Sequence, residues 1–312
     1  MSQAFVHHPV MVDEVVALLS AVPPGVVVDA TIGGGGHARA LLEATVALRV
    51  VGMDRDADAV AAARQSLADY GDRAAVHHAR FDRLSELVPG PLSGALFDLG
   101  VSSPQLDRAG RGFSYRAEGP LDMRMDRSEG RTAADVVNSE DEATLAGLVA
   151  ASGERRFARR IARRIVEARP MATTAELAEV VRNAIPAAAR RSGGHPARRA
   201  FQAIRMVVND ELELLGPALD AAIALLVPGG RCVVLAYHSG EDRIVKERFA
   251  VAASGGCTCP PQLPCVCGAV PKVRLLNRGA RKPSAAEVAA NPRAESARLR
   301  ACERLAAKGI AP

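Results

Sequence analysis

Short runs of apolar residues, many of them β-branched, recur along the first hundred residues and again near residue 230. Runs of this length suit strands that are buried on both faces of a parallel sheet. Stretches with helical periodicity follow the first two runs, at 37–42 and 56–67. The strands that this pattern predicts span residues 26–28, 50–54, 74–78, 94–98 and 231–236. Because strands and helices alternate, we predict a doubly wound α/β fold.

The alternation stops for about a hundred residues in the middle of the chain. Residues 101–130 contain Ser-Ser-Pro, several glycines and several charges, which indicates a long ordered loop. Helical patterns follow at 133–138, 140–152, 154–169 and 174–185. A further helix over 196–226 would return the chain to the sheet. We therefore predict a mostly helical insert at 105–200, between segments 1–104 and 201–312 that together form one α/β domain.

Three of the predicted strands end in an aspartate: Asp29, Asp54 and Asp98. The carboxyl ends of parallel strands meet at one edge of a sheet, and ligands bind at that edge. A single strand-end aspartate often serves only to cap the next helix. Three of them on one edge indicate a ligand site.

Four glycines, Gly33 to Gly36, follow the first predicted strand and precede a helix. The pattern Gly33-x-Gly35-x-x-Ala38, with Asp54 about 20 residues on, fits a dinucleotide loop. The pattern Asp29-x-Thr31-x-Gly33-x-Gly35 equally fits a loop for S-adenosylmethionine (SAM). A glycine-rich turn that binds nothing is the third interpretation. The loop alone leaves the choice between these ligands open.

Arginine is concentrated in the predicted insert. The chain has a net charge of +5, while residues 105–205 hold 19 Arg against 13 Asp and Glu. In the helix predicted over 154–169, arginines form two rows at i, i+4 spacing, and Phe157, Ile161 and Ile165 lie on another face. The two rows comprise Arg155, Arg159 and Arg163, and Arg156, Arg160 and Arg164. Such a stripe is either a solvated face or a surface for a phosphate backbone.

Other features exclude whole classes of protein. The first residues lack the basic and apolar regions of a signal peptide, and no apolar run approaches the length of a membrane span. Six cysteines in 312 residues do not make a secreted disulfide scaffold, so a cytoplasmic location is favoured. Four of them follow the spacing Cys257-x-Cys259-x5-Cys265-x-Cys267. Four thiols in eleven residues could hold a zinc ion tetrahedrally, but structural zinc sites favour two residues between paired cysteines. Zinc binding therefore stays open, and no metal is assigned here.

Longer motifs identify a family. They read DATIGGGGH at 29–37, GVSSPQLD at 100–107, GPLDMRMD at 119–126, GERRFARRIARRI at 153–165, YHSGEDR at 237–243 and NPRAESARLR at 291–300. Together they resemble, in order and over nearly the whole chain, the bacterial MraW-type methyltransferases of small-subunit ribosomal RNA, which methylate cytosine N4. Ala30 stands where the family usually has Gly, and Tyr237 and Gly240 replace Phe and Leu.

The resemblance implies a fold, a cofactor and a substrate. It implies a Rossmann-like SAM-dependent methyltransferase sheet with a helical insert that contacts RNA. It implies SAM as methyl donor and the N4 amino group of a decoding-centre cytidine in 16S rRNA of the 30S subunit as acceptor. A homodimer is one hypothesis for its oligomeric state. The residues that it implies for the SAM site are Gly35, Gly36, His37, Asp54, Phe81, Asp98 and Gln105.

Three side chains are candidates for the chemistry. Asp98 lies where amino-methyltransferases commonly place a D/N-P-P-Y/F motif, which this chain lacks. His238 and Asp242, at the end of the last predicted strand, are the other polar candidates, and each could instead be structural. No cysteine nucleophile is required, because the reaction does not attack a ring carbon.

Overall fold

The computed structural model describes residues 9–88, 90–190, 195–260, 262 and 266–306. The chain divides into two compact units, one formed by residues 1–100 with 212–312 and the other by residues 101–211. The second unit therefore begins before residue 105 and ends after residue 200, the bounds that the hydrophobic pattern placed on the insert.

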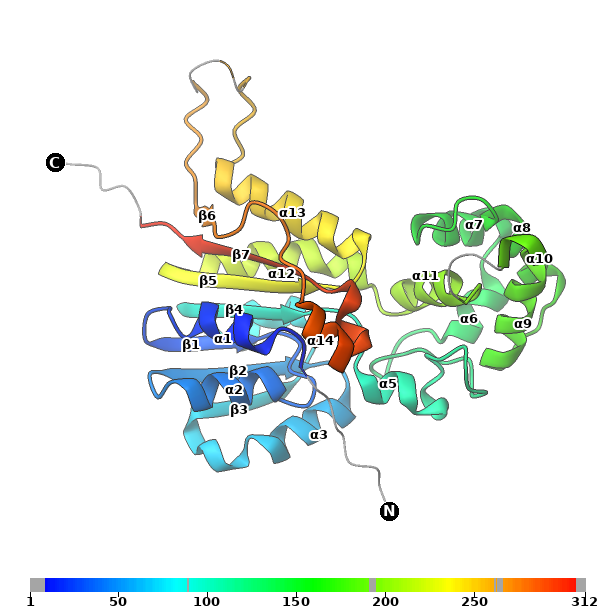
Figure 1. Cartoon of the computed structure of the whole chain (residues 1–312), viewed down its shortest axis with the longest axis horizontal. Coiled ribbons are helices and arrows are strands. Elements are labelled where there is room, and N and C mark those ends of the chain that lie inside the picture. Colours follow the sequence, from blue (N-terminus) through cyan, green and yellow to red (C-terminus); the bar gives the residue numbers. More distant parts are fainter. Residues whose placement is uncertain (1–8, 89, 191–194, 261, 263–265, 307–312) are drawn as a thin grey trace. The chain divides into compact units, whose positions relative to one another are not determined.

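The first unit is built on a seven-stranded sheet with the order β3-β2-β1-β4-β5-β7-β6 (Figure 1). Its strands are β1 (Gly25–Asp29), β2 (Leu48–Asp54), β3 (Ala74–His78), β4 (Leu92–Asp98), β5 (Leu226–Ala236), β6 (Val273–Leu275) and β7 (Arg298–Arg304). The first five strands pair in parallel, and β7 is antiparallel to both of its neighbours. The predicted α/β class is confirmed.

Helices cover both faces of this sheet. They are α1 (Val12–Leu19), α2 (Gly36–Ala44), α3 (Ala57–Ser66), α4 (Leu84–Leu87), α12 (Glu211–Leu225), α13 (Ser239–Ser254) and α14 (Ala285–Ala290). Alternate strand residues face opposite sides, so Val27 packs with α1 and α2 while Val28 packs with α12 and α13. This two-sided burial is why the strands read as continuous apolar runs.

The second unit is helical. It contains α5 (Ser103–Asp107), α6 (Ala133–Ser139), α7 (Glu142–Ala151), α8 (Ala158–Glu167), α9 (Thr174–Ala184), α10 (Ala187–Arg190) and α11 (Arg198–Val208). Its own core includes Ile161 and Ile165 of α8, Leu145 of α7 and Phe201 of α11. Across the described residues of both units, no helix is long and apolar enough to cross a membrane.

The prediction of a single helix over 196–226 is wrong. Two helices occupy this stretch, α11 and α12, and they are separated at Asn209 and Asp210. Asp210 has a φ of +50°, which no α-helix accommodates. Hydrophobic periodicity continues through the break, because both helices bury one face, and it therefore hides the break.

Candidate active site

The strand-end aspartates lie on neighbouring strands of the first unit. Asp54, Asp29 and Asp98 end β2, β1 and β4, which are adjacent in that order and parallel. The strand order reverses between β1 and β4, and open α/β sheets bind ligands in the crevice at that point. Asp29 and Asp98 therefore flank the site that the topology creates.

Glycines shape the loop between β1 and α2. The N–H of Gly35 donates to Ile32 O (2.8 Å), and Gly35 begins α2 from a left-handed conformation with φ +82°. A Cβ on Gly36 would lie 2.9 Å from Pro9 Cγ, so a side chain at this position would displace the preceding segment. The N–H of Gly33 donates to Asp54 Oδ2 (2.9 Å). The glycine loop of β1 is thereby tied to the aspartate that ends β2.

Asp54 is half-buried and held by backbone donors. Besides Gly33, the N–H of Asp56 donates to its Oδ1 (2.9 Å). Burial raises the pKa of Asp54 to about 6, although these two hydrogen bonds oppose the rise. The carboxylate keeps further lone pairs with which it can accept hydrogen bonds from ligand hydroxyls.

Asp98 is fixed by three residues. The Tyr237 hydroxyl donates to its Oδ1 (2.7 Å), and His37 Nδ1 lies 3.6 Å from its Oδ2. The backbone N–H of Asp98 donates to Thr31 Oγ1 (2.6 Å). His37 Nε2 in turn lies 2.9 Å from Val10 O, and it carries a proton because a carbonyl only accepts. Burial, followed by the charge of Asp98, raises the pKa of Tyr237 well above 10, so the phenol stays a donor.

Asp29 is also buried, with 2% of its surface exposed. Its Oδ1 accepts from the N–H of Thr31 (3.3 Å). Burial, aided by the charges of Asp98 and Asp54, raises the pKa of Asp29 to about 8 despite that bond. The carboxyl is consequently protonated at neutral pH, beside the carboxyl groups of Asp54 and Asp98.

Phe81 lies just after β3, at the same edge of the sheet. The N–H of Ala79 donates to Asp54 O (2.9 Å), which brings the segment after β3 to the end of β2. The Phe81 ring packs edge to face on Phe97 of β4, with centroids 6.1 Å apart. The first unit therefore gathers the predicted residues Gly35, His37, Asp54, Phe81 and Asp98 at one edge.

The contacts of His238 favour its structural alternative. His238 Nδ1 accepts from the N–H groups of Gly240 (3.2 Å) and Glu241 (3.3 Å), so the ring caps α13. Its Nε2 lies 3.1 Å from Glu241 Oε1. Nδ1 is thus engaged at the helix start, whereas the buried Nε2 makes no hydrogen bond within the described residues.

Asp242 is likewise engaged by neighbours. Arg300 of β7 bonds both of its oxygens (2.7 and 3.2 Å), and Arg298 reaches Oδ2 (3.3 Å). Burial raises the pKa of Asp242, but these arginines outweigh it and the pKa lies below 3.8. Its contacts hold α13 to the last strand.

Gln105 belongs to the second unit. It is buried in α5, and its Oε1 accepts from the N–H of Ser102 (3.0 Å) in a capping box. This bond fixes the first turn of α5 within the GVSSPQLD motif. Its role toward a cofactor stays a prediction.

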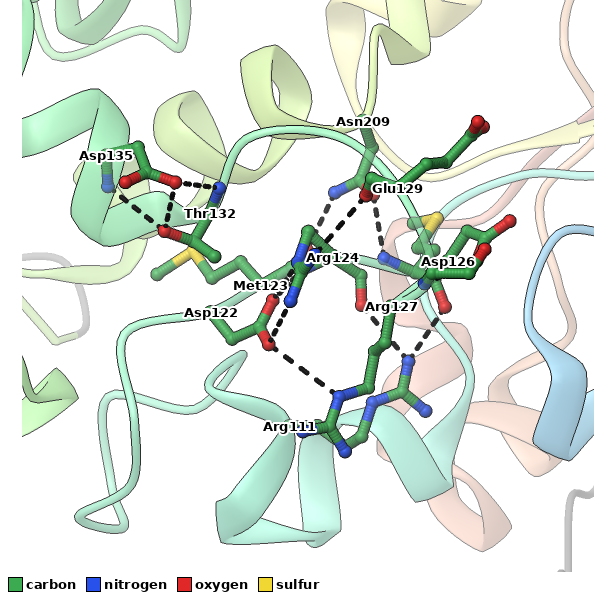
Figure 2. A network of polar contacts seen from close by, with 12 residues as sticks. Arg111, Asp122, Met123, Arg124, Asp126, Arg127, Glu129, Thr132, Asp135 and Asn209 are labelled. Atoms are coloured by element: carbon green, nitrogen blue, oxygen red, sulfur yellow. Dashed lines mark hydrogen bonds and ion pairs between the residues drawn. The ribbon is translucent and has the colours of Figure 1, made fainter.

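The GPLDMRMD motif forms a polar network in the second unit (Figure 2). Arg124 pairs with Asp122 through two bonds of 2.8 and 3.2 Å. The Arg111 guanidinium donates to the carbonyls of Arg124 (3.1 Å) and Met125 (3.0 Å). The loop is held through its backbone carbonyls, so several arginines serve structure.

Asn209 closes this network from the break between α11 and α12 (Figure 2). Its Nδ2 donates to Met123 O (2.8 Å), and its Oδ1 accepts from the N–H of Met125 (2.8 Å). Between these two bonds Met123 adopts a φ of +59°, which is uncommon outside glycine. The amide therefore stabilises a strained turn.

Sequence reasoning missed Tyr237, Thr31 and Asn209 as functional or supporting residues. Only the parallel register of β4 and β5, which pairs Asp98 with Leu235, places Tyr237 near Asp98. Thr31 is part of the glycine-loop motif, but its bond to Asp98 depends on the β1 and β4 pairing. No motif in the chain signals the partners of Asn209.

Known proteins resemble this chain over nearly its whole length. The model of the MraW methylase family matches residues 4–305. The ribosomal RNA small subunit methyltransferase H of Thermobifida fusca is 54% identical over 97% of this chain and 94% of its own length. The proteins of that name from Acidothermus cellulolyticus and Heliobacterium modesticaldum are 52% and 47% identical, over 97% and 96% of this chain and 94% and 99% of their own lengths. The chain belongs to the MraW methylase family.

Proposed function

We propose that this methylase transfers a methyl group from SAM to small-subunit ribosomal RNA. The family match over residues 4–305 carries the proposal, together with the name that the curated relatives share. The finer assignment, to the N4 amino group of a decoding-centre cytidine in 16S rRNA, rests on the motifs. A homodimer stays a prediction.

The chemistry of the strand-end residues fits SAM better than a dinucleotide. SAM carries a cationic sulfonium and no phosphate, so it requires carboxyl acceptors and close backbone approach. Asp29, Asp54 and Asp98 supply the acceptors, and Gly33 and Gly35 supply bare backbone. The carboxylates of Asp54 and Asp98 would repel the pyrophosphate of a dinucleotide.

Each residue at this edge receives a role in the proposal. Asp54 accepts hydrogen bonds from the ribose hydroxyls, and Phe81 borders the adenine. Gly35, Gly36 and His37 lie along the methionine and ribose part. When bound, SAM supplies an activated methyl group, which leaves positioning as the main task of the protein.

Asp98 is our choice for the group that orients the acceptor amine. Cytosine N4 is a weak nucleophile because its lone pair is delocalised into the ring. A carboxylate that accepts a hydrogen bond from the amine favours its pyramidal form and can receive its proton. Tyr237 holds Oδ1, which leaves Oδ2 as the atom for this task. In this proposal His238 and Asp242 have structural roles: His238 caps α13 after β5, and Asp242 ties α13 to β7.

The test is methyl transfer from labelled SAM to 30S subunits taken from a strain that lacks the enzyme. Mass spectrometry of the digested nucleosides identifies the product. We expect N4-methylated cytidine at one site. A different methylated nucleoside would overturn the acceptor and keep the cofactor. Tight SAM binding without transfer to 30S subunits, to naked 16S rRNA or to assembly intermediates would favour an inactive assembly factor.

A further inference from the structure

A segment rich in cysteine lies between α13 and β6, in the first unit. Figure 1 shows it as an arm that leaves the sheet after α13 and returns to it at β6. The chain enters it through Gly255 and Gly256, which both have positive φ. Neither the methylase site nor the sheet uses this arm, so its thiols require an explanation of their own.

Three thiols of the arm converge. The Sγ atoms of Cys257, Cys259 and Cys267 all lie within 4.8 Å of one another. The Sγ atoms of Cys257 and Cys267 are 3.6 Å apart. Cys265 lies outside the described residues.

The spacing of the sulfur atoms distinguishes a metal site from a disulfide. A disulfide requires about 2.05 Å between sulfurs. Four thiolates around zinc, each about 2.3 Å from the metal, lie about 3.8 Å from one another. The 3.6 Å between Cys257 and Cys267 matches the spacing of sulfurs that share a zinc ion.

Backbone donors support the same geometry. The N–H groups of Val266 and Cys267 are directed at the sulfur of Cys259. Donors of this kind orient a sulfur ligand and stabilise its negative charge. They come from the return side of the arm, so the three sulfurs are held from both sides.

Two described apolar side chains of the arm are largely exposed. Val266 is 88% exposed and Val270 is 64% exposed, and the three cysteines are at least partly accessible. Cysteine is among the most buried residue types when it serves packing alone. Three accessible thiols on a segment without a core are typical of a metal site that supplies the missing stability.

We propose that Cys257, Cys259 and Cys267 bind a zinc ion that ties the two sides of the arm together. Thiolate ligands select zinc, copper(I) or iron–sulfur clusters over magnesium, calcium or manganese. Zinc accepts tetrahedral thiolate sites without redox chemistry, which suits a structural role. The inference is independent of the methyl acceptor.

The first experiment measures metal in the full chain, expressed with added zinc and purified without chelators. We expect about one zinc per chain by inductively coupled plasma mass spectrometry. Cys259→Ser should reduce this to below a tenth. Val266→Ala, an exposed change in the same arm, is the matched control and should keep the metal. Full zinc in Cys259→Ser, or less than a tenth of an equivalent in the wild type, would overturn the site.

A second measurement uses only the wild type, in case the cysteine variants fail to fold. The native protein is alkylated with and without prior removal of zinc by a chelator, and the modified cysteines are mapped by mass spectrometry. Zinc should protect Cys257, Cys259 and Cys267 together. Equal labelling in both samples, a mass that shows a disulfide, or stoichiometric iron or copper would each contradict the proposal.

Discussion

At the scale of single residues, the candidate site depends on how Asp98 is held. The carboxylate receives a hydrogen bond from Tyr237 and faces His37, which is itself anchored to Val10. The sequence could predict Asp98 because it ends an apolar run. It could not predict Tyr237, because the partner comes from a strand that follows more than 100 residues later.

Replacing Asp98 with Asn tests the proposed role directly. Asn keeps the volume but cannot take a proton from the amine, so we expect kcat to fall by at least about 100-fold. Asp220→Asn, the same change at an exposed position of α12, should leave kcat unchanged. The measurement is single-turnover transfer to 30S subunits. Full turnover by Asp98→Asn would remove Asp98 from the chemistry.

Tyr237→Phe removes only the hydroxyl that donates to Asp98. A hydrogen bond to a charged group contributes about 1.5 to 3 kcal/mol, so we expect the free energy of unfolding to fall by about that amount. Because the Asp98 carboxylate itself is kept, kcat should fall much less than in Asp98→Asn. Chemical denaturation measures the first effect. The control is Tyr70→Phe, which removes a hydroxyl that donates to Glu43 at an exposed site and should change stability little. An equal loss of stability in both variants would show that the bond from Tyr237 to Asp98 contributes no more than an exposed one.

At the scale of elements, amphipathic helices were the easiest to predict and their ends the hardest. In α8, Ile161 and Ile165 are buried and the arginines face outward, as the periodicity predicted. The helix begins at Ala158 and not at Glu154, because residues 154–157 form a turn after Gly153. Turn geometry of this kind leaves no periodic signal.

The outer face of α8, together with the turn that precedes it, is our candidate for contact with RNA. Replacing Arg156, Arg160 and Arg164 with Gln should weaken RNA binding and leave SAM affinity unchanged. If all three contact phosphates, the slope of log K against log salt should fall by about 3. Filter binding at several salt concentrations measures both quantities.

A charge-matched control removes three exposed arginines of the first unit, Arg49, Arg83 and Arg278. It should change the salt dependence much less, because its lost charges lie outside the proposed surface. Equal slopes of log K against log salt for both variants would mean that only net charge matters. The arginines of α8 would then form a solvated face and not an RNA contact.

The break between α11 and α12 is a second feature of this scale. Asn209→Ala leaves Met123 O and the Met125 N–H without their partner at a site that is closed to water. Each unsatisfied group costs about 1 to 3 kcal/mol, so we expect a loss of at least about 2 kcal/mol from the two. Denaturation of the variant measures it, with Asn183→Ala, an exposed change in α9, as the control. A loss below 1 kcal/mol would show that Asn209 does not support the turn.

At the scale of the whole molecule, the parallel strands of the sheet could be predicted, while the strands that complete the sheet could not. The apolar runs ahead of Asp29, Asp54 and Asp98 are short, but each ends in an acid, so their pattern is readable. β6 is short, and β7 is partly exposed and rich in arginine. The place of β7 in the sheet depends on its pairing with β5, which lies more than 60 residues earlier in the chain.

Stability of the whole fold should depend on pH through Asp29. Its pKa rises from 3.8 to about 8 on folding. Between these values the folded chain keeps a proton that the unfolded chain has released, so the free energy of unfolding falls as pH rises from about 4 to about 8. Asp29→Asn should flatten this decline, as measured by denaturation across that range. Asp69→Asn, on the surface, should not; parallel curves for Asp29→Asn and the wild type would be evidence against the buried acid.

The strand order also determines when each part of the chain can fold during synthesis. Unit 2 is complete once residue 211 has been made, whereas unit 1 then has only β1 to β4 of its seven strands. β5 stays an open edge until β7, near residue 300, pairs with it. A nascent chain therefore carries a finished helical unit beside an unfinished sheet whose exposed edge is a site for mispairing. The growing chain is most exposed to aggregation over its last hundred residues.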